Sequence, residues 1–187
     1  MNSPKFDRVF SPFDGAPVEA CTVGDPMCEG VDVGPIMDER SAVRIQTWID
    51  EARAAGAEVL TGGHREKSII QPTVIARSTP GMRMEDEEIF GPVLTVNPFD
   101  RFDEAVSRAN ATNYGLQGGL FTTELRRVFS AIDDWDVGGL IVNDVPIYRV
   151  DNMPFGGWKE SGLGREGTVY AMDEMTDIKH LVINYSS

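Results

Sequence analysis

Two cysteines, Cys21 and Cys28, are the strongest nucleophiles in the sequence. A thiol attacks carbon at neutral pH only when a nearby base or positive charge lowers its pKa, and no sequence feature near either cysteine supplies one. A disulfide between them would need an oxidising compartment. Because the first fifteen residues lack the apolar stretch of a secretory signal, we expect two free, non-catalytic thiols in a cytoplasmic protein.

Other patterns that could hold an ion or a nucleotide are weak. The chain has only two histidines, His64 and His180, and no Cys-x-x-Cys pair, so we expect no metal site. The glycines of Ser161–Gly167 surround Arg165 and superficially look like a phosphate-binding loop. The Gly-Lys-Ser/Thr signature and the strand-turn-helix context are both missing, so nucleotide binding there is not expected.

The composition indicates an acidic globular chain. The 187 residues suffice for one domain with its own core, and 41% hydrophobic and 25% charged residues are ordinary globular values. A net charge of −13 disfavours nucleic acid and anionic membranes as partners, because both attract clustered Lys and Arg. No apolar run approaches the roughly 18 residues that a membrane span needs.

Apolar residues at helical spacing predict three helices. In Asp38–Ala55 one face carries Ile45, Trp48, Ile49 and Ala52. Acidic residues suit the start of this helix, and Gly56 is expected to end it. The same spacing predicts a helix at Phe102–Ala111, capped by Asp100 or Asp103, and another at Thr123–Asp133, capped by Thr122 or Thr123.

Short apolar segments between these helices predict strands. They are Glu58–Thr61, Ile69–Ile75, Val93–Asn97, Gly118–Thr122, Gly139–Asn143 and His180–Asn184. Strands that alternate with helices predict an α/β layered domain with a mainly parallel sheet. The last strand has no later element to cover it, so it pairs either within its own sheet or with another subunit.

Eight motifs follow one another in an order that chance does not produce. They are Val23–Pro26 (VGDP), Asp32–Glu39 (DVGPIMDE), Gly56–Gly63 (GAEVLTGG), Gln71–Ile75 (QPTVI), Glu87–Val96 (EEIFGPVLTV), Asn113–Thr122 (NYGLQGGLFT), Gly138–Pro146 (GGLIVNDVP) and Arg149–Gly167 (RVDNMPFGGWKESGLGREG). This series resembles the C-terminal part of the catalytic domain of the NAD(P)-dependent aldehyde dehydrogenase superfamily. The branch that acts on lactaldehyde, glyceraldehyde-3-phosphate or phosphonoacetaldehyde looks most similar.

The resemblance implies a fold, a reaction and four site residues. The fold would be the family's α/β catalytic domain with a C-terminal oligomerisation strand, and the reaction would be oxidation of an aldehyde to a carboxylic acid with NAD or NADP. Glu88 matches the family's nicotinamide-ribose contact and Phe90 the ring near the cofactor; a solvated acidic run is the alternative for Glu88. Phe155 matches an aldehyde-tunnel aromatic or is a core residue. Arg149 meets an anionic substrate group or forms a surface ion pair with an acid such as Asp151.

The sequence also departs from the family pattern. The Gly-Gln-x-Cys and Glu-Leu-Gly-Gly segments that carry the family's nucleophile and general base are not in these residues, so no catalytic residue is assigned. Residues 1–22 resemble the start of a full-length member, or a shortened strand and helix, and residues 23–187 the C-terminal catalytic-domain portion, with the oligomerisation strand near 180–184. We therefore expect no turnover by this chain alone and doubt that it binds NAD or NADP unaided.

These departures leave a second function open. The chain could be a non-catalytic assembly module that self-associates, or that joins a full-length aldehyde dehydrogenase, through its terminal strand. Apolar surface that relatives bury would also recruit a partner. We therefore expect a homo-oligomer, most simply a dimer.

Overall fold

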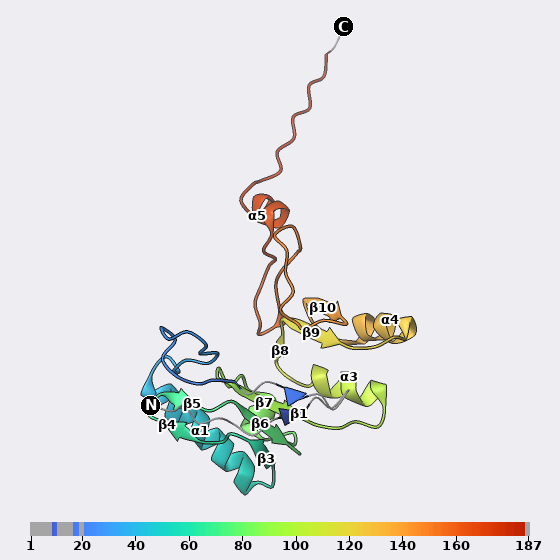
Figure 1. Cartoon of the computed structure of the whole chain (residues 1–187). Helices are drawn as coiled ribbons and strands as arrows, with labels where there is room; N and C mark the ends of the chain where they lie inside the picture. The colour runs from blue at the N-terminus through green and yellow to red at the C-terminus, as the bar shows by residue number, and fades with distance from the viewer. Residues whose placement is uncertain (1–8, 11–16, 19–20, 186–187) are drawn as a thin grey trace. The chain divides into compact units, whose positions relative to one another are not determined.

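The computed structural model describes residues 9–10, 17–18 and 21–185, and the chain divides into two compact units (Figure 1). The first unit is Met1–Pro98 and the second is Phe99–Ser187. Within the described ranges, no helix is both long and apolar enough to cross a membrane.

Helix α1, Glu39–Ala54, confirms the strongest helix prediction. Asp38 is its N-cap, and the carboxylate accepts a hydrogen bond from the backbone N–H of Ser41 at 2.7 Å, which holds the pKa of Asp38 below its usual value. At the other end Gly56 has a φ of +101°, and the N–H of Ala57 donates to the carbonyl of Ala52 at 2.9 Å. Glycine adopts this left-handed geometry without strain, so the helix ends where the sequence predicts.

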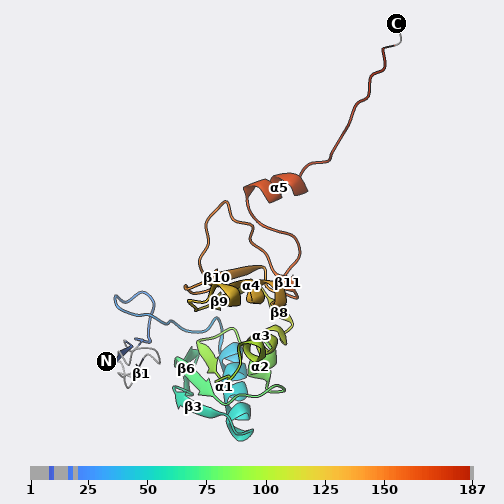
Figure 2. The ribbon, with the colours of Figure 1, turned by 90° about the vertical axis from the view of Figure 1, so that its right-hand side faces the viewer.

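A three-stranded sheet packs against α1 in the first unit (Figure 2). Its strands are β3 (Glu58–Thr61), β6 (Thr73–Ala76) and β7 (Val93–Val96), in the order β3-β6-β7. β6 runs parallel to β7 and antiparallel to β3. The core between helix and sheet contains Ala42, Ile45, Ile49, Ala52, Ala57, Ile70, Ile75 and Met84.

Four shorter strands and one short helix complete the first unit. β1 (Val9–Phe10) pairs with β2 (Pro17–Val18), β4 (Arg65–Glu66) pairs with β5 (Ile69–Ile70), and α2 spans Arg83–Asp86. The prediction of one strand over Ile69–Ile75 is wrong, because β5 and β6 are separate. Pro72 lies between them and has no N–H to donate to a ladder. Most of the predicted segment 1–22 lies outside the described residues.

The second unit is built around a β-α-β crossover. β9 (Gln117–Leu120) leads through α4 (Leu125–Asp134) to β10 (Gly139–Val142), which pairs with β9 in parallel. Helix α3 (Phe102–Asn110) contacts α4, and the antiparallel pair β8 (Tyr114–Gly115) and β11 (Trp158–Lys159) precedes α5 (Thr168–Glu174). The α/β fold with parallel strands is therefore confirmed.

The predicted caps of α3 and α4 are wrong. Arg101 and Glu124 occupy the N-cap positions, and neither makes a side-chain capping hydrogen bond. Asp103 pairs with Arg101 instead, and this hydrogen bond lowers the pKa of Asp103. The Thr122 hydroxyl accepts a hydrogen bond from the N–H of Glu124 at 3.1 Å. Thr122 therefore stabilises a turn that precedes the helix and does not cap the N–H groups of the first helical turn.

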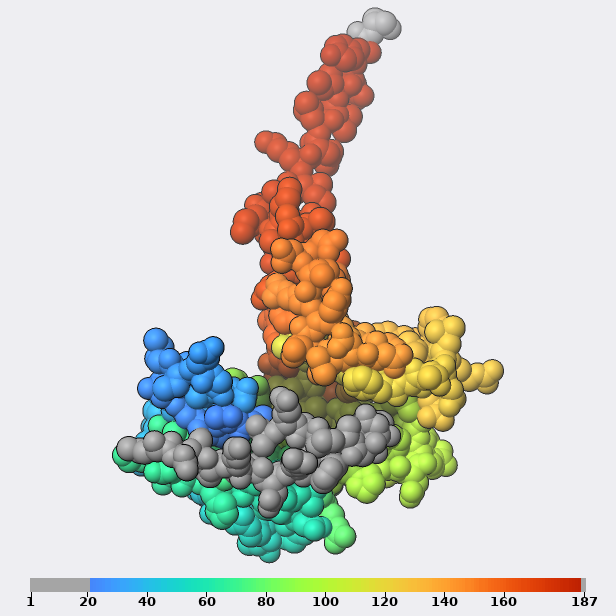
Figure 3. All heavy atoms as spheres, in the orientation of Figure 1, coloured from blue at the N-terminus to red at the C-terminus, as the bar shows by residue number. Residues whose placement is uncertain are grey.

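The segment after α5 differs from its prediction. His180–Asn184 forms no ladder with any described strand, so the expected pairing within its own sheet is not seen among the described residues. The segment continues from α5 as a single extended run (Figure 3), with Leu181 81%, Val182 73% and Ile183 59% exposed. A strand is stable only when a neighbour satisfies its backbone groups, and no described segment of this chain does so.

Candidate functional site

Glu88 and Phe90 lie on the turn between α2 and β7, in the first unit. The Glu88 side chain is exposed, and it makes no hydrogen bond or ion pair with any described residue. A free carboxylate in this position can accept hydrogen bonds from two hydroxyls of a ligand. Its oxygens are therefore available to a ligand, because nothing else within the described part of the chain uses them.

Phe90 has an unusual backbone conformation. Its φ is +51°, in the left-handed region that residues other than glycine seldom adopt, and its side chain is 72% exposed. Such a conformation costs on the order of 1–3 kcal/mol and persists only where neighbouring structure enforces it. Because the ring is mostly exposed, its packing does not offset this free-energy cost. The conformation is therefore enforced by contacts that the neighbouring residues of the turn make.

Arg149 and Phe155 come together in the second unit. The guanidinium carbon of Arg149 lies 4.3 Å from the centroid of the Phe155 ring, and its Nη2 donates to Glu166 at 3.0 Å. Glu166 is fixed beside Phe155, because the two residues exchange backbone hydrogen bonds of 3.0 and 2.6 Å. The Arg149 side chain remains 44% exposed, so it retains donors that face solvent.

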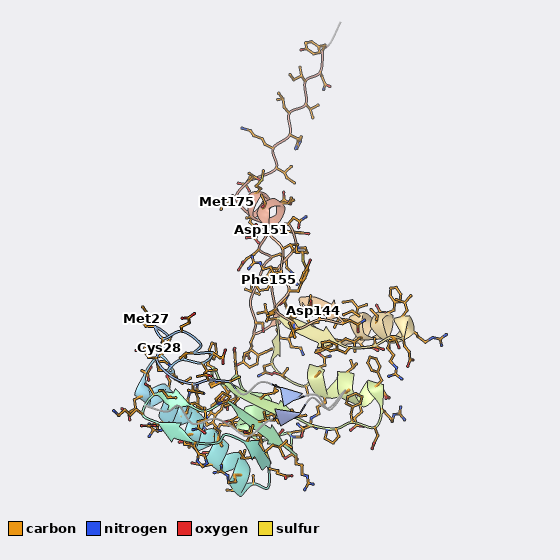
Figure 4. All side chains as sticks on the ribbon, in the orientation of Figure 1. Met27, Cys28, Asp144, Asp151, Phe155 and Met175 are labelled. Atoms are coloured by element: carbon orange, nitrogen blue, oxygen red, sulfur yellow. The ribbon has the colours of Figure 1, made fainter. Side chains whose placement is uncertain are left out.

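These two residues line a small open pocket with a volume of about 20 Å³. The rest of the lining is Leu116, Gln117, Gly138, Gly139, Met153, Pro154 and Gly156. Phe155 lies on the stretch between β10 and β11 that also carries Asp144 and Asp151 (Figure 4). Phe155 is half-buried at this pocket, and Arg149 pairs with Glu166 rather than with Asp151.

Sequence reasoning missed how much of this pocket is main chain. A Cβ added at Gly138 would stand 1.6 Å from the carbonyl oxygen of Gly156, so the two peptides are in direct contact. The signal was the Gly-Gly pair at 138 and 139 together with the pair at 156 and 157. Paired glycines mark close backbone approach, but a sequence does not say which glycine meets which.

The two thiols lie at the surface of the described part of the chain. Cys21 and Cys28 are both free and exposed, and Cys28 lies beside Met27 on the loop that precedes α1 (Figure 4). Across the described ranges, no group of three or more His, Cys, Asp or Glu side chains could hold a metal ion.

The chain is similar in sequence to known aldehyde dehydrogenases. The sequence profile of the aldehyde dehydrogenase family matches residues 13–181. A 3-sulfolactaldehyde dehydrogenase of Priestia aryabhattai is 42% identical over 166 residues, which cover 89% of this chain and 35% of that enzyme. A lactaldehyde dehydrogenase of Methanococcus aeolicus is 38% identical, over 89% of this chain and 36% of its own length. The chain thus spans about a third of these relatives.

Solved structures agree with the sequence relatives. Aldehyde dehydrogenase 21 of Physcomitrella patens, in complex with the reaction product succinate, matches with a TM-score of 0.80 and 45% identity, over 83% of this chain and 32% of that one. A glyceraldehyde-3-phosphate dehydrogenase of Methanocaldococcus jannaschii complexed with NADP has a TM-score of 0.80 and 36% identity, over 85% and 34%. With the motif order, the fold and these matches in agreement, this chain belongs to the aldehyde dehydrogenase family.

Proposed function

We propose that this chain supplies the aldehyde-binding pocket and the nicotinamide-ribose contact of an NAD(P)-dependent aldehyde dehydrogenase. The observation that carries the proposal is the pair Arg149–Phe155, which puts a partly exposed guanidinium beside an aromatic ring in one small pocket. An apolar wall with one cationic group suits a short aldehyde that bears an anionic group.

The substrate class follows from the donors of Arg149. A planar guanidinium binds carboxylate, phosphate or sulfonate oxygens through two parallel N–H bonds. Similar enzymes are named for 3-sulfolactaldehyde and glyceraldehyde-3-phosphate, and the Physcomitrella enzyme holds succinate. Because the ion pair with Glu166 uses Nη2, an incoming anion would displace this carboxylate or share the guanidinium with it.

Glu88 and Phe90 are the proposed cofactor contacts. The unpartnered carboxylate of Glu88 would accept the nicotinamide-ribose hydroxyls, and the exposed ring of Phe90 would limit water beside them. When bound in a complete active centre, NAD or NADP supplies the hydride acceptor of the family's reaction.

The chain alone would not turn over an aldehyde. The family's nucleophile motif does not occur in these 187 residues, and Cys21 and Cys28 are both exposed. The thiolate that attacks the aldehyde would therefore come from outside these residues. This chain would bind and orient the substrate, hold its anionic end and accept the ribose hydroxyls.

The test is formation of NADH or NADPH at 340 nm by the purified chain, with short anionic aldehydes and each cofactor. We expect no rate above that of a Cys21→Ala/Cys28→Ala control, because no sequence motif near either thiol marks an activating base. A rate that the double variant loses would make one of these cysteines the nucleophile and contradict the assignment of both as bystanders.

A second candidate function is assembly, and the terminal segment favours it. Three neighbouring apolar residues, Leu181–Ile183, are exposed on an extended backbone that no described strand of this chain pairs. Such an edge gains hydrogen bonds and buried apolar area when it pairs with another chain. The partner would be a second copy, which gives a dimer, or a full-length aldehyde dehydrogenase.

Light scattering across a dilution series tests this assembly. We expect a dimer for the parent chain and for Val182→Ala, and a monomer for Val182→Pro, because proline removes a backbone donor from the ladder. A monomeric mass of the parent at every concentration would refute self-association. Co-elution with a full-length relative would then be the remaining form of the assembly function.

A further inference from the structure

Arg44, on α1, makes a long-range contact with the turn that carries Glu88 and Phe90. Its Nη2 donates to the carbonyl oxygen of Ile89 at 2.7 Å, across 45 residues of sequence. The side chain is half-buried, and it forms no ion pair with any acid of the described chain. In so acidic a chain an arginine would ordinarily pair with a carboxylate. Arg44 instead donates to one backbone carbonyl, which is an unusual role for a guanidinium.

The buried indole of Trp48 holds this guanidinium in place. Its ring centroid lies 4.6 Å from the guanidinium carbon of Arg44 and 5.3 Å from that of Arg83 on α2. Arg83 in turn makes a bidentate ion pair with Glu51 of α1. The stack therefore ties α1 to α2 immediately before the turn and limits the directions in which Arg44 can donate.

The carbonyl of Ile89 belongs to the peptide that precedes Phe90, so its direction is coupled to the φ of Phe90. That φ is +51°, although the ring is 72% exposed and packing does not enforce it. The next two residues, Gly91 and Pro92, are fixed by contacts that do not involve Arg44. A Cβ at Gly91 would stand 2.7 Å from Ile45 Cδ1, and the carbonyl of Pro92 accepts from the N–H of Thr73 at 2.9 Å.

We propose that Arg44 is a positioning residue: its hydrogen bond to Ile89 fixes the left-handed turn at Phe90 and thereby orients Glu88 and Phe90. This role rests on the proposed function only in that the turn would contact the cofactor. The hydrogen bond from Arg44 and its effect on the turn are properties of the chain itself. Contacts at Gly91 and Pro92 anchor one end of the turn, and Arg44 sets the peptide where the strained residue begins.

The experiment measures backbone ¹⁵N order parameters of the full chain in four forms: parent, Arg44→Met, Arg44→Lys and Arg40→Met. Methionine keeps an apolar stem over Trp48 but has no donor. We expect the order parameters of Phe90 and Gly91 to fall from about 0.85 to below about 0.6 in Arg44→Met. Arg44→Lys, which retains one donor for Ile89, should recover most of the loss. Arg40, exposed on the same helix, is the matched control and should change nothing.

Unchanged order at Phe90 in Arg44→Met would overturn the proposal. A loss of order spread along α1 and β7 would also overturn it, because Arg44 would then be merely structural. The cofactor role of the turn is tested separately, by adding millimolar NAD or NADP to the parent. If the Glu88 and Phe90 signals do not move, the cofactor role fails. If Arg44→Met still lowers the order parameters of the turn, the positioning role of Arg44 is supported all the same.

Discussion

Gly138→Ala is expected to destabilise the second unit by about 3 kcal/mol or more, at the upper end of what overpacking costs. The added Cβ would stand 1.6 Å from the carbonyl oxygen of Gly156 and 3.0 Å from that of Leu116. Both obstacles are main chain, which cannot rotate away as the end of a flexible side chain does. The displaced peptide adjoins Phe155, so the pocket should be lost together with stability.

Urea unfolding followed through NMR signals of the second unit measures this cost. Gly139→Ala is the matched control, because its Cβ would meet only the Gln117 side chain, at 3.5 Å or more. We expect the control to change the free energy of unfolding by less than about 1 kcal/mol. Equal losses in both variants would attribute the effect to replacing a glycine at this point of the backbone rather than to the contact with Gly156.

Arg149→Met is expected to weaken binding of succinate, used as a simple dianion probe, by at least about tenfold. A hydrogen bond to a charged group contributes about 1.5–3 kcal/mol, which corresponds to roughly 10- to 150-fold in affinity. Methionine can still pack on the Phe155 ring, but it has no N–H to donate. Shifts of the Gly138 and Gly156 amide signals during a titration would report the binding.

Two further variants make this result specific. Glu166→Gln should strengthen succinate binding, because the carboxylate 3.0 Å from Arg149 Nη2 competes with the ligand. Arg126→Met, which removes an exposed arginine of α4, should leave the affinity unchanged. If Arg149→Met binds succinate as well as the parent does, the arginine serves only its ion pair with Glu166.

Helix α1 was predictable because several independent signals coincide there. Asp38 at the N-cap, one apolar face and Gly56 after the last turn all indicate the same boundaries, and the structure places the helix within one residue of them. β3 was likewise predicted with its observed bounds. Elements with local signals at both ends leave little freedom for tertiary contacts to move them.

The shortest elements gave no such signals. α2 spans four residues, and β8 and β11 span two each, so none is long enough to show a period of 3.6 or of 2. Their positions depend on long-range contacts, such as the hydrogen bond from the N–H of Gly115 to the Ser161 hydroxyl at 2.9 Å. The caps of α3 and α4 failed for a related reason, since several polar residues near each start could have been the cap.

The candidate site was predictable in its residues but not in its contacts. Motifs selected Arg149 and Phe155, yet the stacking of Arg149 on the Phe155 ring and its ion pair with Glu166 depend on a loop with no periodic pattern. Arg44 was not selected at all, because on α1 it reads as an ordinary polar residue beside the apolar face. Only the fold shows that it reaches a carbonyl 45 residues away.

The contact between Gly138 and Gly156 also limits how this pocket can diverge over evolutionary time. Part of the wall is peptide groups, and no substitution can enlarge, charge or reshape a peptide group. New ligand preferences would therefore have to arise at the residues that present side chains to the pocket, which are Leu116, Gln117, Arg149, Met153, Pro154 and Phe155. The pocket could then exchange one ligand for another through these side chains while the two glycines stay unchanged.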